Sequence, residues 1–170
     1  MVSPDKDKLQ TLVDLLLYIG HQPGIIFSNF KDSIDEVSAY LDKNRINYTC
    51  FSGGMEQRDR ERSLIKFRNG TCQVLVATDL AARGIDIPEL KYIIHYELPR
   101  TLEEFTHRNG RTARVNASGT AYVLQWKKEY VPSFIENAEP IDISKKAPHK
   151  PVFWETLFVS GGRKDKISKG

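Results

Sequence analysis

Short apolar runs alternate with amphipathic stretches along most of this chain, and the alternation restricts the fold more than any other feature. Runs of four residues, bounded by polar or turn residues, predict strands buried on both faces. They lie at 24–27, 48–51, 74–77, 92–95 and 121–124. Amphipathic stretches between them predict helices at about 32–44 and 56–68. Such alternation is typical of an α/β fold with a parallel sheet between two layers of helices.

Residues that favour helix ends add further boundaries. Ser3 and Pro4 fit the N-cap and first helical position of a helix whose apolar stripe covers 9–17. The residues at 101–104, Thr-Leu-Glu-Glu, have the capping-box pattern and predict another helix start. Gly110 follows closely and predicts the end of that helix.

Small polar residues directly follow three of the predicted strands. Ser28 and Asn29 follow the first, 52–54 (Ser-Gly-Gly) the second, and 78–79 (Thr-Asp) the third. Ligands of parallel sheets bind beyond the carboxyl ends of the strands. The clustering therefore predicts a ligand site at this edge of the sheet.

The stretch "HRNGRTAR" at 107–114 gathers cationic side chains in eight positions. His107, Arg111 and Arg114 have the spacing i, i+4 and i+7, which places them on one helical face. Like charges at this spacing repel one another. We therefore expect an anionic partner for this face, and guanidinium groups match phosphate oxygens especially well.

The chain has no motif that would bind phosphates or perform catalysis by itself. It lacks the G-x-x-x-x-G-K-[ST] phosphate loop, a Ser-His-Asp or Cys-His constellation and a metal-binding cluster. Two cysteines and a net charge of +3 are ordinary for a cytoplasmic protein, and no apolar run is long enough to span a membrane. The arginines are thus expected to act on phosphates bound by a neighbouring domain.

The length of 170 residues fits one domain with a short tail. We expect a domain at 1–143, a basic, proline-bearing linker at 144–151 and a tail at 152–170. The tail is too short to build its own core.

Four blocks, "IIFSNF", "SGGMEQRDRERSLIKFRNG", "VLVATDLAARGIDIPEL" and "HRNGRTAR", resemble in order and spacing the second motor domain of DEAD-box RNA helicases. The resemblance covers about residues 6–135. It implies a RecA-like three-layer α/β/α fold with a mostly parallel sheet. It also implies that ATP with Mg²⁺ is bound mainly by the N-terminal RecA-like domain of the same protein, which is absent from this chain.

The resemblance assigns three cationic residues to catalysis. Arg111 and Arg114 would reach the γ-phosphate of ATP as arginine fingers, and His107 would bridge towards the partner domain. The alternative for all three is a solvated basic patch at a helix C-terminus. Arg108 is expected to pair with a local carboxylate such as Asp79.

The "RGID" residues would complete the ATP site. Asp86 resembles the residue that accepts a hydrogen bond from the ribose, Gly84 lets the backbone approach, and Arg83 would link across the cleft. The alternatives are a turn that uses glycine for its backbone freedom and an exposed loop arginine.

The resemblance places RNA contacts on Asn29, Gly53, Gly54, Arg60 and Thr78. The glycine pair would offer backbone N–H groups to a phosphate ahead of a helix. Simpler interpretations are a turn at the glycines and a helix cap at the threonine. Contacts to phosphates fix the register of the RNA but do not discriminate sequence.

The sequence departs from the family pattern at three positions. Phe30 stands where a small polar residue is common, so the phosphate contact there is expected to be replaced by packing or stacking. Gly54 replaces a frequent Asp and Asn109 a frequent apolar residue, and neither touches the arginine pattern. The tail "TLFVSGGRKDKISKG" resembles the start of the RNA-binding domain of DbpA-type bacterial helicases. That resemblance implies structured, ribosomal RNA as substrate and a role in ribosome assembly.

The expected function is therefore the second motor domain of an ATP-dependent RNA helicase, inactive alone, monomeric and not bound to a membrane. A non-enzymatic α/β module that binds RNA or protein is the main alternative, and a DNA-directed helicase of the same superfamily is the third.

Overall fold

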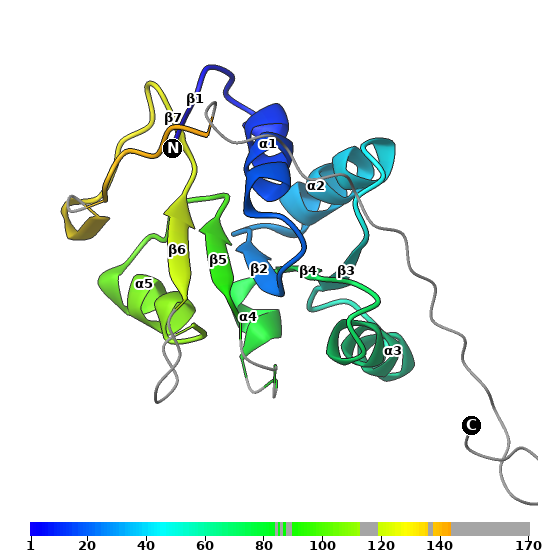
Figure 1. The fold of residues 1–170 in the computed structure, drawn as a ribbon. Helices are drawn as coiled ribbons and strands as arrows, with labels where there is room; N and C mark the ends of the chain where they lie inside the picture. The colour runs from blue at the N-terminus through cyan, green and yellow to red at the C-terminus, as the bar shows by residue number, and fades with distance from the viewer. Residues whose placement is uncertain (84, 86, 88–89, 113–118, 136–137, 144–170) are drawn as a thin grey trace, which may run out of the picture.

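A five-stranded parallel sheet forms the centre of the molecule in the computed structural model (Figure 1). The structure describes residues 1–83, 85, 87, 90–112, 119–135 and 138–143. In spatial order the strands are β3 (Tyr48–Phe51), β4 (Val74–Ala77), β2 (Gly24–Phe27), β5 (Tyr92–His95) and β6 (Thr120–Val123). Four have the predicted bounds, and β6 begins one residue earlier than predicted. The predicted α/β fold is confirmed.

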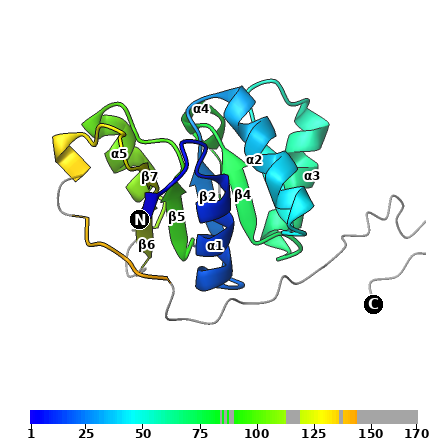
Figure 2. The same ribbon diagram turned by 90° about the horizontal axis from the view of Figure 1, so that it is seen from above.

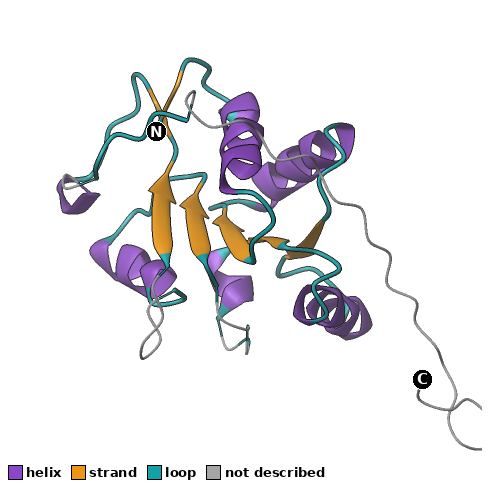
Figure 3. Ribbon diagram, viewed as in Figure 1, coloured by secondary structure: helices purple, strands orange, loops and turns teal. Residues whose placement is uncertain are grey.

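Helices cover both faces of this sheet (Figures 2 and 3). One face carries α1 (Leu9–Ile19) and α2 (Lys31–Lys43), and the other carries α3 (Gln57–Arg68), α4 (Asp79–Ala82) and α5 (Leu102–Asn109). Three short elements lie near the chain ends: β1 (Val2–Ser3), β7 (Gln125–Trp126) and a 3₁₀ turn at Ser133–Ile135. The layers match the predicted three-layer arrangement.

Alternating strand residues build two separate cores. Every residue of β2, β4 and β5 is buried, which explains why these strands are continuous apolar runs. Ile26, Val76 and Ile94 point into the core under α1 and α2. Their neighbours Ile25, Leu75 and Ile93 point into the core under α3 and α4.

Gly24 permits close contact between β2 and β5. A Cβ atom at this position would overlap the ring of Tyr92, which is itself buried. Any larger residue would therefore have to displace an aromatic ring within the core.

The prediction for the N-terminus was wrong. Ser3 does not cap a helix: it lies in β1, which pairs with β7, and its hydroxyl accepts a hydrogen bond from Thr11 at 2.9 Å. The helix begins only at Leu9, after Lys8 turns the chain with a φ of 59°. Pairing with a distant strand thus overrides the local capping pattern.

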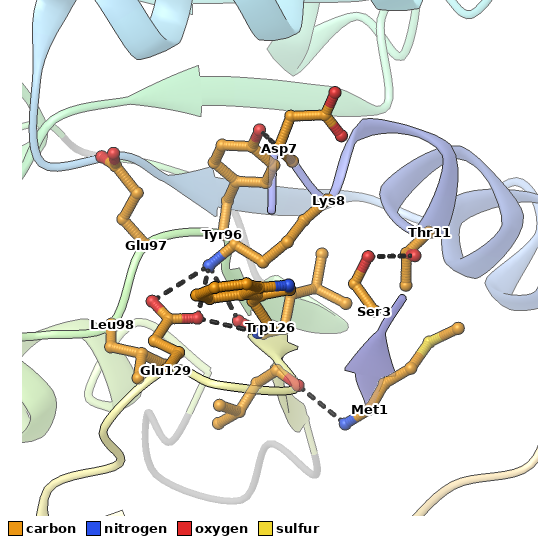
Figure 4. A network of polar contacts seen from close by, with 12 residues as sticks. Met1, Ser3, Asp7, Lys8, Thr11, Tyr96, Glu97, Leu98, Trp126 and Glu129 are labelled. Carbon is orange, nitrogen blue, oxygen red and sulfur yellow. Dashed lines mark hydrogen bonds and ion pairs between the residues drawn. The ribbon is translucent and has the colours of Figure 1, made fainter. Parts of the chain in front are cut away.

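Lys8 ties the two ends of the domain together (Figure 4). Its side chain is buried, and its ammonium donates hydrogen bonds to the carbonyl of Leu124 and the carboxylate of Glu129, both at 3.1 Å. The ring of Tyr96 lies 5.5 Å from the same nitrogen. The positive charge is therefore compensated inside the fold.

The predicted linker at 144–151 and the tail at 152–170 lie outside the described residues. Within the described part of the chain, no helix is long and apolar enough to cross a membrane.

Candidate functional site

A buried arginine organises the carboxyl edge of the sheet. Arg108 on α5 is 1% exposed, and its guanidinium donates to both carboxylate oxygens of Asp79 at 2.8 and 2.6 Å. It also donates to the side-chain oxygen of Asn29 at 2.6 Å and to the backbone carbonyl of Glu97 at 2.8 Å. The predicted pair with Asp79 is confirmed, and it joins the residues after β2, β4 and β5 into one rigid unit.

The ring of His95 lies beneath this arginine. Its Nε2 is 3.1 Å from Oδ1 of Asn109, and its Nδ1 is 3.5 Å from Arg108. Because an amide oxygen only accepts, the proton sits on Nε2. Burial, together with the nearby positive charge of Arg108, lowers the pKa of His95 to about 4. The imidazole is therefore neutral, and its contact with Asn109 holds the last residue of α5 against β5.

Three of the residues predicted for catalysis or ATP binding line one narrow cleft. Arg83, His107 and Arg111 surround it together with Asp79 and Glu104. The cleft holds about 10 Å³, room for no more than a single water molecule. A phosphate would thus contact its cationic rim and would need a second wall from elsewhere.

The helix end sets the spacing of that rim. Thr101 caps α5 by accepting a hydrogen bond from the backbone N–H of Glu104, which confirms the predicted helix start. The helix ends at Asn109, but Gly110 keeps helical backbone angles. His107 and Arg111 therefore remain one turn apart. Arg114, Gly84 and Asp86 lie outside the described residues.

Asn29 has a structural role that its sequence position does not reveal. Its side-chain oxygen accepts from Arg108, and its amide nitrogen donates to the carbonyl of Leu98 at 3.0 Å. Its backbone N–H donates to the carboxylate of Glu97 at 2.5 Å. Asn29 thus holds the segment after β5 in place, and its contact with RNA stays a prediction.

The glycine turn after β3 is open to ligands. Gly53 and Gly54 are exposed, and no atom lies within 4 Å of a Cβ built on Gly53. The following helix, α3, begins without a side-chain cap, and the backbone N–H of Asp59 in its first turn already donates to the carbonyl of Glu56. Arg60 lies one turn into this helix, with its guanidinium 5.9 Å from the ring of Phe51.

Thr78 serves as the cap of α4, which was the simpler of its two interpretations. Its hydroxyl accepts from the N–H of Ala81 at 3.4 Å. The hydroxyl proton is still able to donate to a ligand.

Arg100, at this edge, was not among the predicted site residues. Arg100 lies just beyond β5, and its guanidinium is 4.9 Å from the ring of Phe30. Both side chains are exposed. Its position in the sequence could have identified it, because Arg100 follows a predicted strand at the sheet edge where the other polar clusters also lie.

The comparisons with known proteins agree with this geometry. Residues 7–116 match the model of the helicase conserved C-terminal domain. The chain is 42% identical over 121 residues to the DEAD-box ATP-dependent RNA helicase 21 of Oryza sativa subsp. japonica, covering 71% of this chain and 16% of that protein. It is 41% identical over 114 residues to the ATP-dependent RNA helicase DDX4 of Mus musculus, with 67% and 16% covered. This chain thus spans about a sixth of the length of these curated relatives.

Solved structures show the same fold. The E. coli DEAD-box protein SrmB, bound to regulator of ribonuclease activity A, matches with a TM-score of 0.69 and 35% identity, and 74% of each chain is covered. The C-terminal domain of the DEAD-box protein Dbp5 matches with a TM-score of 0.64 and 28% identity, and 73% of this chain and 72% of that one are covered.

Proposed function

Because this chain belongs to the helicase conserved C-terminal domain family, in the form found in DEAD-box RNA helicases, we propose that it supplies arginine fingers to ATP held by a first motor domain. Arg111 and Arg114 act on the γ-phosphate, and His107 contacts the partner domain. The single observation that supports this most is the cleft in which Arg83, His107 and Arg111 meet. The cleft is too small for a nucleotide, as expected of one wall of a shared site.

The buried network explains how the fingers are held. Arg108 is fixed by four hydrogen bonds to Asp79, Asn29 and Glu97, so its guanidinium is not free to contact a phosphate. It anchors α5, and this holds Arg111 at the rim of the cleft before ATP binds. Preorganised charge of this kind stabilises a transition state because little reorganisation is needed.

ATP binds with Mg²⁺ in this scheme, and the cation neutralises charge on the phosphates. The ribose is bound through Asp86, with Gly84 allowing close approach of the backbone. When the two motor domains close on ATP and RNA, they bend one RNA strand and so separate a short duplex. Hydrolysis of ATP then lets the two domains open again.

RNA lies along the same edge of the sheet in this proposal. Gly53, Gly54 and the start of α3 offer backbone N–H groups to a phosphate, with Arg60 in reach of the same group. Asn29 and Thr78 extend the surface across β2 and β4. The protein acts as a monomer on structured RNA, and the resemblance of the tail to DbpA-type helicases favours ribosomal RNA and ribosome assembly.

The test is Arg111→Ala in the full-length protein, with RNA present at saturating concentration. We expect ATP to bind with nearly unchanged affinity while kcat falls by about a thousandfold or more, because the finger acts on charge that develops during phosphoryl transfer. Arg68→Ala removes an exposed arginine at the far end of α3 and is the matched control. Wild-type turnover in Arg111→Ala would exclude the finger assignment.

A further inference from the structure

Two exposed side chains stack on each other at the sheet edge. The guanidinium carbon of Arg100 lies 4.9 Å from the centroid of the Phe30 ring, and the ring is 54% exposed. Among the described residues, no carboxylate lies within ion-pair distance of the guanidinium of Arg100. The charge of Arg100 is thus directed at the ring face, where the attraction orders both side chains.

Phe30 occupies a position where a phenylalanine weakens the fold. It is the N-cap of α2, with extended backbone angles and no hydrogen bond from its side chain to the helix. Serine, threonine, aspartate and asparagine favour this position because their oxygen atoms accept from the first N–H groups. Lys31, the first helical residue, adds a positive charge at the positive end of the helix dipole. Asp32 in the same turn offsets this charge, so the missing cap at Phe30 is the choice that opposes local stability, as is expected where function selects the residue.

The sheet topology aligns this pair with the proposed RNA contacts. The strand order β3-β4-β2-β5 puts the glycine turn, Thr78, Phe30 and Arg100 at successive strand ends. Three strand spacings of about 4.8 Å give a row roughly 14 Å long. Lys31, next to Phe30, reaches the glycine turn, since its ammonium lies 3.8 Å from the position of a Cβ on Gly54.

We infer that Phe30 and Arg100 form a stacking platform for one unpaired base of the bound RNA strand. The base lies against the open part of the phenylalanine ring, while Arg100 holds the ring and adds positive charge beside the RNA backbone. Stacking of this kind tolerates any base, because each base has a π-face. The inference rests on the proposed function, since it needs RNA to lie along this edge.

The test measures binding of single-stranded RNA oligonucleotides to the 170-residue chain by fluorescence anisotropy at low ionic strength. One RNA carries all its bases. Each RNA of a matched series lacks the base at a single nucleotide, and that nucleotide differs from one RNA to the next. We expect the wild-type chain to lose about 5- to 150-fold in affinity when one particular base is absent. Phe30→Thr should lose the same factor with the complete RNA and no longer discriminate within the series.

Two control variants separate the possible failures. Phe30→Tyr keeps a ring and should bind like the wild type, whereas Arg60→Ala should weaken binding to every RNA alike. Phe30→Thr also restores a helix cap, so it should raise the urea midpoint of unfolding while weakening RNA binding. A merely structural Phe30 would not give opposite changes in these two measurements.

Two results together would refute the platform. Arg60→Ala would weaken RNA binding while Phe30→Thr would not, and the wild-type chain would bind every RNA of the base-deleted series with the same affinity. Should Arg60→Ala also have no effect, or the wild type bind none of the RNAs, the proposed RNA surface fails together with the platform.

Discussion

Acidification should destabilise this domain through one residue, His95. Its pKa in the fold is about 4, against an ordinary value of 6.5 that the unfolded chain restores. Between these values the unfolded state binds a proton that the native state excludes, so falling pH favours unfolding. Above about pH 7 both states are neutral, and the residue contributes no pH dependence.

The size of the effect follows from the two pKa values. Their difference of about 2.5, at roughly 1.4 kcal/mol per pH unit, gives about 3.4 kcal/mol once the pH is below 4. At pH 5 the same relation gives about 2 kcal/mol relative to pH 8. A loss of this size is a large part of the stability of an ordinary domain.

Urea unfolding of the chain at pH 8 and pH 5 measures this loss, and His95→Gln is the matched control. Glutamine is neutral at both pH values and keeps a donor for Asn109 and an acceptor for Arg108. All other titrating groups are common to both proteins, so the difference between their pH dependences isolates the imidazole. The wild type should lose about 2 kcal/mol more than the variant. Equal losses would mean that the buried ring is not kept neutral by its surroundings.

Two further predictions concern the packing, and one concerns the shared ATP site. Arg108→Met should destabilise the domain by about 3–5 kcal/mol in urea unfolding, because it leaves the Asp79 carboxylate without its partner. A loss of stability below about 1 kcal/mol would contradict the anchoring role of Arg108. Gly24→Ala should cost about 1–3 kcal/mol through the clash with Tyr92, whereas Gly53→Ala, in open space, should leave the thermal midpoint nearly unchanged. The isolated chain should release no phosphate from ATP in a coupled assay, and RNA-stimulated turnover by pure chain would refute the shared-site proposal.

The strands were predictable because burial on both faces imposes a local signature. A continuous apolar run such as 74–77 needs no knowledge of its neighbours to be recognised. The helix α4 was indicated only by the capping interpretation of Thr78, because four residues are too few to show a 3.6-residue period. Strands β1 and β7 were missed because two-residue strands exist only through their pairing with each other.

The candidate site was predictable in outline and not in detail. The strand-end rule located the edge, and charge complementarity suggested the pair of Arg108 with Asp79. The position of Asn29 against Arg108 depends on how β2 and α5 approach each other, which no local pattern records. The same holds for His95 and Asn109, whose contact is visible only once α5 is packed on the sheet.

The contact between Lys8 and Glu129 has a consequence for biosynthesis. During synthesis Lys8 is made 121 residues before its partner Glu129. Until then the ammonium must remain hydrated, and α1 lacks its final attachment. A nascent chain halted between these two residues therefore lacks this buried ion pair, and α1 gains this attachment only after β7 has been made.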